Sequence, residues 1–300
     1  MSGTRIYLTG ADGLLGTALT ATLREDPRTA GWTWCGVSRD DYDIADETAT
    51  VASITRFRPD IVVHSAANAV VDDCEANPAR ALAVNVAGVR NVARACLHSG
   101  ARLVYLSSDY VFDGYDNPPG GYREDDLPSP LSVYGVTKLA GERIAGQLPG
   151  HLIIRTSWLF GGADERVDVV LHSVRQALRG EPVRLIADQY SRPTSTVDLA
   201  RAMVFLLTRQ RPVTGTVHVA NAGTASWHEV VTYALALAPP LPGPAPEAVP
   251  FDGYPFLGRR PRNSALNTDR LTGLGHAMPH WKDAVRRFAV TLLPVETARR

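Results

Sequence analysis

The stretch Arg5-Ile-Tyr-Leu-Thr-Gly-Ala-Asp-Gly-Leu-Leu-Gly16 begins as an apolar run and continues through regularly spaced glycines into an amphipathic segment. Residues 5–9 predict a buried strand and residues 14–24 predict a helix. Glycine permits the tight turn between them and lets backbone amides approach a pyrophosphate, whose charge a helix N-terminus favours. We therefore expect a dinucleotide site here, with cofactor contacts at Gly10, Gly13, Leu14, Leu15 and Gly16.

Short apolar runs and longer helical segments continue to alternate through the first half of the chain. Further strands are expected at 34–38, 61–65, 102–107 and 152–156, and further helices at 49–57, 79–98 and 134–147. The runs starting at Ile61 and Leu103 are continuously apolar, so both faces of those strands should be covered by helices. This pattern predicts an α/β fold with a doubly wound parallel sheet of Rossmann type.

The second half of the chain is less regular. Runs at 183–186 and 216–219 predict short strands that rejoin the first sheet, whereas six prolines within 239–250 exclude a regular helix or a central strand. We expect residues 1–158 to form the dinucleotide-binding domain, with 183–220 rejoining its sheet. Residues 159–300 should mainly form a smaller, interleaved α/β substrate domain.

Composition narrows the class of protein. Hydrophobic residues make up 45% of the 300 residues, and 31 basic residues balance 31 acidic ones, which gives no reason to expect nucleic acid or an anionic membrane as partner. No apolar run approaches the roughly 20 residues of a membrane span. The three widely spaced cysteines fit reduced thiols, and the eight histidines show no ligand spacing, so we predict a cytoplasmic protein without a bound metal.

The residues after the second expected strand bear on the choice of cofactor. Ser38 and Arg39 stand where an acidic residue would bind a ribose 2′-hydroxyl. Arg39 could meet a 2′-phosphate instead, which favours NADPH. Asp40 and Asp41 follow closely and leave NADH open.

Three polar residues suggest hydride-transfer chemistry. Ser108 directly follows the strand expected at 102–107, and Tyr134 and Lys138 share one face of a later helix at i, i+4 spacing. An ammonium beside the phenol would lower the tyrosine pKa from about 10, so that Tyr134 could exchange a proton with a carbonyl oxygen near neutral pH. Ser108 would donate a hydrogen bond to that oxygen.

Beyond these residues, longer motifs resemble the extended short-chain dehydrogenase/reductases and, among them, the dTDP-4-dehydrorhamnose reductase family. The motifs span nearly the whole chain: Ser107-Ser-Asp-Tyr-Val-Phe-Asp-Gly114, Val133-Tyr-Gly-Val-Thr-Lys-Leu-Ala-Gly-Glu142, Arg155-Thr-Ser-Trp158, Asp188-Gln189, Pro193-Thr194, Ser226-Trp227, Arg260-Pro261, Asn263-Ser264 and Leu266.

The resemblance implies NADPH-dependent reduction of the 4-keto group of a dTDP-4-keto-6-deoxyhexose in rhamnose or specialised deoxysugar biosynthesis. It implies catalysis by Ser108, Tyr134 and Lys138. Further cofactor contacts are implied at Ser38, Arg39, Asp43, Ile44, Ala66, Ala67, Asn68, Tyr134 and Lys138, and substrate contacts at Ser108, Asp109, Tyr134, Trp158 and Arg260. The family also allows a homodimer. Some members bind a metal through a Glu at the position of Ala18, so no metal is predicted here.

Some positions depart from the family pattern, and two other functions stay open. Ala69 replaces a Thr, Arg166-Val167 replaces an Asn-Phe pair, and Ser191 replaces a Gly, all near the substrate side. One alternative is a sugar-nucleotide epimerase or dehydratase that retains NAD. The other is a non-catalytic NADP-binding subunit, because the family also resembles the regulatory subunit of methionine adenosyltransferase.

Overall fold

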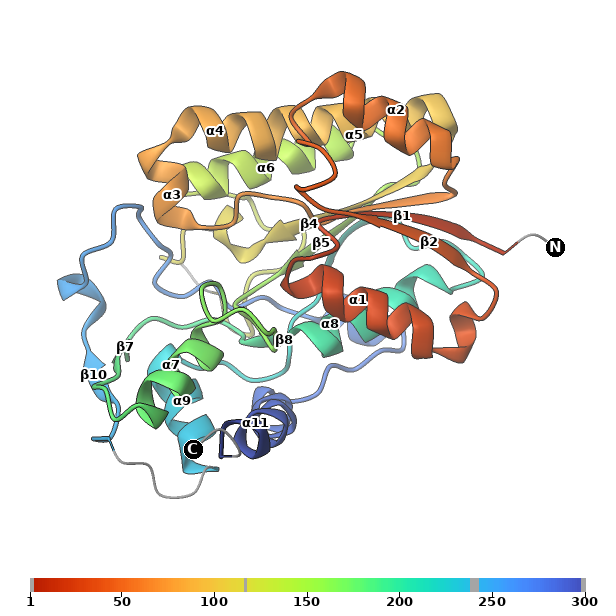
Figure 1. Cartoon of the computed structure of the whole chain (residues 1–300). Coiled ribbons are helices and arrows are strands. Elements are labelled where there is room, and N and C mark those ends of the chain that lie inside the picture. The colour runs from red at the N-terminus through yellow and green to blue at the C-terminus, as the bar shows by residue number, and fades with distance from the viewer. Residues whose placement is uncertain (1–2, 116–117, 238–242, 298–300) are drawn as a thin grey trace.

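A computed structural model describes residues 3–115, 118–237 and 243–297, with side chains to residue 292. Six parallel strands form the central sheet in the order β2-β1-β3-β4-β5-β9 (Figure 1). They are β1 (Arg5–Thr9), β2 (Thr33–Val37), β3 (Ile61–His64), β4 (Arg102–Ser108), β5 (Leu152–Thr156) and β9 (Gly215–His218). The predicted α/β fold with a doubly wound parallel sheet is confirmed.

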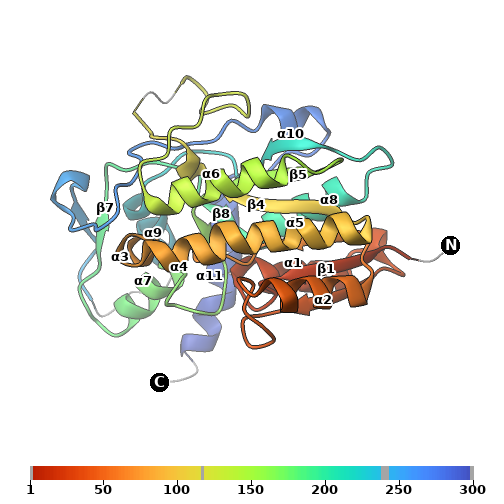
Figure 2. The ribbon, with the colours of Figure 1, turned by 90° about the horizontal axis from the view of Figure 1, so that it is seen from above.

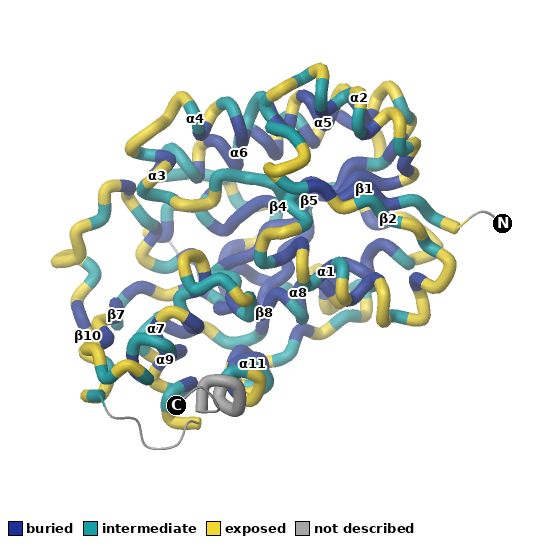
Figure 3. Tube along the Cα trace, in the orientation of Figure 1, coloured by how far each residue is buried: buried dark blue, intermediate teal, exposed yellow. Residues whose placement is uncertain are grey.

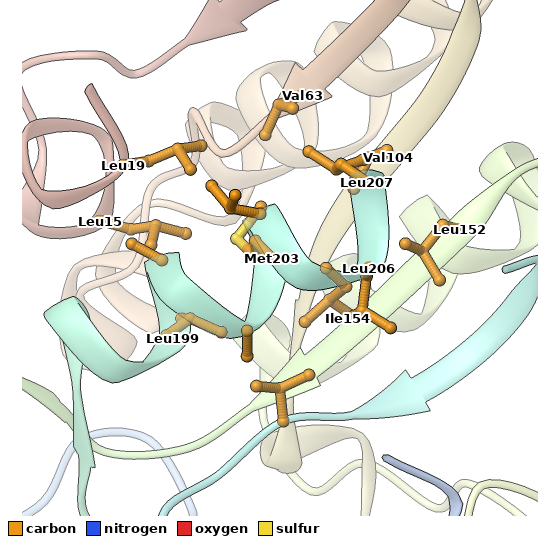
Figure 4. Packing of buried hydrophobic residues seen from close by; sticks show 14 of the residues in the cluster. Leu15, Leu19, Val63, Val104, Leu152, Ile154, Leu199, Met203, Leu206 and Leu207 are labelled. Atoms are coloured by element: carbon orange, nitrogen blue, oxygen red, sulfur yellow. The ribbon is translucent and has the colours of Figure 1, made fainter. Parts of the chain in front are cut away.

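Helices cover both faces of this sheet, as the continuous apolar runs predicted. One face carries α1 (Leu14–Glu25) and α8 (Thr196–Leu207), whose apolar side chains pack with those of the strands in the cluster of Figure 4. The other face carries α2 (Glu47–Phe57), α5 (Gly88–Ser99) and α6 (Val133–Ala145). Figure 2 shows α5 and α6 running along this outer face, and Figure 3 shows the buried strands between the two layers.

The helix expected over 79–98 is divided. It consists of α4 (Pro78–Leu82), a π-helical segment, Ala83–Ala87, and α5, and a separate short helix, α3 (Val71–Ala76), precedes it. Such π segments occur often at functional sites, and this one brings the buried amide of Asn85 towards the end of β3.

The smaller part of the molecule packs beside the carboxyl ends of the strands. It contains α7 (Val169–Leu178), α9 (Trp227–Ala236) and α11 (Trp281–Thr297), together with the paired strands β6 (Leu159–Phe160) and β8 (Thr194–Ser195). Helix α10 (Asp269–Gly273) instead packs against β9 and buries Leu271 in the core of the central sheet. Short 3₁₀ turns lie at Pro27–Thr29, Asp109–Val111 and Phe251–Gly253. Among the described residues, no helix has both the length and the apolar character needed to cross a bilayer.

One expected strand joins a different sheet. The run at 216–219 does rejoin the large sheet, as β9 beside β5. The run at 183–186 does not: it forms β7 (Arg184–Ile186), which pairs with β10 (Glu247–Val249) in a separate sheet. Val183 and Leu185 bury their side chains in a small cluster with α7 and α9, so these helices take the place of the central sheet. Part of the proline-rich segment, 238–242, lies outside the described residues.

The strand order creates a crevice. After β1 the chain forms β2 on one side of it and then β3 on the other, so the connections diverge between β1 and β3. In open α/β sheets, ligands bind outside the carboxyl ends of the strands at such a point.

Candidate active site

The glycine loop brings backbone amides to this crevice. Gly10 has φ +70°, and a Cβ at that position would lie 2.9 Å from the amide nitrogen of Ala66. A Cβ on Gly16 would overlap the carbonyl oxygen of Gly10. Helix α1 then begins at Leu14 without a side-chain cap and without an acidic residue in its first turn. Its first N–H groups and positive dipole end are therefore free to bind an anionic group.

The loop after β2 contains Ser38 and Arg39, both expected to contact the cofactor, with Arg39 as the candidate ligand of a 2′-phosphate. The side chain of Arg39 is exposed and makes no ion pair with the described residues, whereas the amide of Ser38 donates to the Asp41 carboxylate at 2.8 Å. Asp43 accepts from Arg80 at 2.8 Å and from the Ala45 amide, which lower its pKa.

The loop after β3 is held by Asn85, a residue that sequence reasoning missed. The amide of Asn68 donates to Asn85 Oδ1 at 2.8 Å, and Asn85 Nδ2 donates to the Asn68 carbonyl at 2.9 Å and to Thr137 Oγ1 at 3.0 Å. Asn85 thus ties the loop formed by Ala66, Ala67 and Asn68 to helix α6. The sequence signal that could have identified Asn85 is a polar residue among the apolar positions of an expected helix. Ile44 is buried against α5, where a Cβ on Gly88 would lie 2.9 Å from its side chain.

The three predicted catalytic residues come together at the carboxyl end of β4. Ser132 caps α6 by accepting from the Gly135 amide, which places Tyr134 in the first turn, where its phenol is hydrogen-bonded to Ser108. Lys138, one turn later, donates from Nζ to the Leu106 carbonyl at 2.6 Å.

The pKa of Tyr134 differs from the expectation. Burial raises it above its usual value, against the lowering effect of the Ser108 hydrogen bond. Burial also lowers the pKa of Lys138 to about 7. The ammonium contacts the Leu106 carbonyl and the face of the Tyr105 ring, 4.5 Å away, so desolvation of the phenol prevails.

Helix α6 is fixed against the sheet by buried groups. Arg155 of β5 makes a bidentate pair with Glu142, with both N–O distances 2.8 Å and side-chain exposures of 5% and 6%. Glu75 accepts from the Val133 amide at the other end of the helix, at 2.7 Å. Gly141 gives the room for close approach, because a Cβ there would overlap the Tyr105 hydroxyl.

Asp109 follows Ser108 and is buried, with 1% exposure. Its carboxylate accepts from Ser108 at 3.0 Å, from Ser191 at 2.9 Å and from Ser264 at 2.5 Å. Burial raises its pKa to about 6, opposed by the three hydroxyl donors.

Trp158 has a strained backbone between β5 and β6. Its φ is +45°, which is rare for a bulky residue and tends to be retained at functional sites. Its indole stacks on that of Trp227, with ring centroids 4.6 Å apart and planes 7° from parallel. Trp227 begins α9 immediately after a capping box formed by Ser226 and Glu229, so a rigid helix end supports the indole of Trp158.

Arg260 is already engaged by neighbouring groups. It pairs with Asp72 at 2.9 Å, donates to the Gly258 carbonyl and lies over the Phe256 ring at 3.9 Å. Of the departures from the family pattern, Arg166 pairs with Asp164 at the surface, whereas Ser191 faces inward to Asp109.

Known proteins match this chain along nearly its whole length. The family described as RmlD substrate binding domain matches residues 4–293. A dTDP-4-dehydrorhamnose reductase of Sinorhizobium fredii is 33% identical over 96% of this chain and 98% of that protein, and one of Streptomyces griseus is 38% identical over 94% and 91%. The crystal structure of the Bacillus anthracis dTDP-4-dehydrorhamnose reductase in complex with NADP has a TM-score of 0.86 at 31% identity, covering 96% of this chain and 99% of that one. This chain therefore belongs to the dTDP-4-dehydrorhamnose reductase family.

Proposed function

We propose that this protein reduces the 4-keto group of a dTDP-4-keto-6-deoxyhexose, using NADPH as hydride donor. The observation that carries the proposal is the hydrogen-bonded Ser108 and Tyr134 pair, with Lys138 one helical turn away, beside an uncapped helix at the sheet crevice. A relative from Streptomyces niveus named dTDP-4-keto-6-deoxy-D-glucose reductase, 36% identical, supports the same substrate class.

The chain's own groups fit a dinucleotide. The free amides of Leu14 and Leu15 would hold the pyrophosphate, because a helix N-terminus favours negative charge. Arg39 would meet the 2′-phosphate, and Ala66 to Asn68 would border the nicotinamide. When bound, the cofactor supplies the hydride for the carbonyl carbon.

Tyr134 would provide the proton that the carbonyl oxygen requires. Its raised pKa keeps the phenol protonated at neutral pH, as an acid for reduction must be. Ser108 would orient the same oxygen, and Lys138, partly charged because its pKa is about 7, would stabilise the phenolate left after proton transfer.

We also propose which residues contact the substrate and which part of the chain binds the cofactor or the sugar nucleotide. Trp158 would form an aromatic wall for the sugar. Asp109 and Arg260 would lie on the sugar and phosphate sides, although Arg260 would have to exchange its Asp72 contact for the ligand. Residues 1–158 would bind the cofactor and 159–300 mainly the sugar nucleotide, with α8 and β9 returning to the first part.

The decisive experiment follows NADPH oxidation with dTDP-4-keto-6-deoxyhexoses of each stereochemistry at C3 and C5. Turnover with at least one supports the proposal, and Tyr134→Phe should abolish turnover while cofactor still binds. No turnover with any of them overturns it. An NAD that survives purification would favour an epimerase or dehydratase, and NADPH binding without turnover of any substrate would favour the regulatory subunit.

A further inference from the structure

Asp109 collects hydroxyl groups from distant parts of the chain. Oδ1 accepts from the adjacent Ser108, whereas Oδ2 accepts from Ser191 and Ser264, which are 82 and 155 residues away in sequence. The two distant hydroxyls also lie within hydrogen-bond distance of each other, at 3.3 Å. Serines of the second half of the chain therefore act on a carboxylate that is in direct contact with the proposed catalytic serine.

The hydrogen bonds of Ser108 have a defined direction. A serine hydroxyl has one hydrogen and two acceptor positions. Ser108 gives its hydrogen to Asp109, and its oxygen accepts from the amide of Tyr110 at 3.2 Å. With Asp109 ionised, the hydrogen of Ser108 is drawn towards the carboxylate and away from a substrate oxygen.

We propose that Asp109 is a positioning residue that acts through Ser108, and that Ser191 controls when it does so. Protonated Asp109 donates to Ser108, which frees the serine hydrogen to turn towards the substrate carbonyl. Ionised Asp109 holds that hydrogen back. The inference rests on the proposed function, because it takes the ketone as the group that Ser108 binds.

The surroundings of Asp109 make this switch accessible near neutral pH. Burial raises the pKa of Asp109 to about 6, and no cation is among the groups that shift it. The titratable groups that face it are Tyr134 from α6 and Tyr110 from its own turn, whose pKa values burial raises, so both stay neutral. The segments of Ser191 and Ser264 present hydroxyls to it.

Ser191 opposes protonation of Asp109. A hydroxyl that donates to a carboxylate favours the ionised form and so lowers its pKa. A glycine at this position would lack that donor. With Ser191, the pH range in which the protein reduces the ketone should therefore lie lower than it would with glycine at this position.

The test measures kcat/KM for sugar reduction against pH in wild type, Asp109→Asn, Ser191→Ala and Ser191→Gly. In wild type, kcat/KM should fall as pH rises through the pKa of Asp109. Asp109→Asn should lose this dependence, because the amide is a permanent donor. Both Ser191 variants should move it upward by about one pH unit, a tenfold change in the ionisation constant or about 1.4 kcal/mol. Ser99→Ala, which removes a hydroxyl bonded within α5, is the control and should leave the profile unchanged.

A second readout separates this inference from the proposed function. Infrared difference spectra between low and neutral pH should show a protonated carboxyl band that Asp109→Asn lacks and Ser191→Ala shifts to higher pH, whether or not any sugar is turned over. NADPH binding, followed by fluorescence, checks that each variant is folded. The inference is wrong if the Asn variant keeps both the band and the pH dependence. It is also wrong if the Ser191 variants lower kcat without moving either titration.

Discussion

The buried pair between Arg155 and Glu142 should be the most sensitive support of the catalytic helix. Glu142→Gln keeps the shape of the side chain and removes its charge. The guanidinium is then left with the Glu124 carbonyl at 3.5 Å, a His218 ring nitrogen at 3.4 Å and the amide oxygen of the new glutamine. Burial lowers the pKa of His218, so its ring stays neutral, and the nearby Glu124 carboxylate is already bonded to the His218 amide at 2.9 Å.

The expected cost follows from this geometry. Removing one partner of a buried, bidentate ion pair typically destabilises a protein by about 3–5 kcal/mol, because the remaining charge is desolvated without compensation. For domains of 150–250 residues, each kcal/mol corresponds to a Tm change of roughly 2–4 °C, so Tm should fall by about 6–20 °C. An exposed control, Glu47→Gln, loses contacts to Arg90 and Arg94 and should cost less than about 1 kcal/mol per pair.

Urea unfolding followed by circular dichroism measures these differences. The double variant Glu142→Leu with Arg155→Met tests whether the unpaired cation causes the destabilisation. Replacing both charged groups by apolar ones removes that cation. It should recover most of the stability lost in Glu142→Gln. A loss below 1 kcal/mol in the single variant, or a double variant no more stable than the single one, would refute the reasoning.

Three further changes test other parts of the site. Gly16→Ala should weaken NADPH binding at least tenfold by fluorescence titration, because the new methyl group overlaps the Gly10 carbonyl; unchanged affinity would contradict the role of this loop. Trp227→Leu removes a stack with Trp158 that is worth about 0.5–1.5 kcal/mol. The near-ultraviolet circular dichroism of the tryptophan pair should vanish, and KM for the sugar should rise two- to tenfold. The control Trp227→Phe should retain most of the affinity for the sugar. Burial lowers the pKa of Lys138 to about 7, so the unfolded chain binds more protons from about pH 7 to 10 and unfolding free energy rises with pH there. Lys138→Met should flatten this rise, and an unchanged slope in urea titrations would count against it.

The first half of the fold was accessible from sequence because its signals are local. The strands expected at Arg5–Thr9 and Leu152–Thr156 have the predicted bounds. Those expected at 61–65 and 102–107 differ by one residue at their ends, and the one expected at 34–38 is shifted by one residue, to 33–37. Continuous apolar runs and the glycine loop depend on near neighbours in the chain. The spacing of Tyr134 and Lys138 is likewise a property of a single helix.

Features that depend on tertiary packing were not accessible. The π segment around Asn85 lies within an uninterrupted helical pattern, and its reason appears only where the side chain meets the loop at Asn68. The run at 183–186 has the composition of a strand, but composition does not tell which sheet it joins. Its partner at 247–249 lies beyond α9, and the intervening helix packing decides the pairing.

The surroundings of Asp109 are the clearest case of information that spacing does not contain. Ser191 is recognisable in sequence only as a departure from glycine near the substrate side, which suggests a direct effect on the sugar. In the structure its hydroxyl is buried and bonded to Asp109. The substitution therefore acts on the acid that orients Ser108, and only through it on the substrate. The serine at position 191, which sequence alone would assign to substrate choice, is better explained as a change in the protonation state of Asp109 at the start of the reaction.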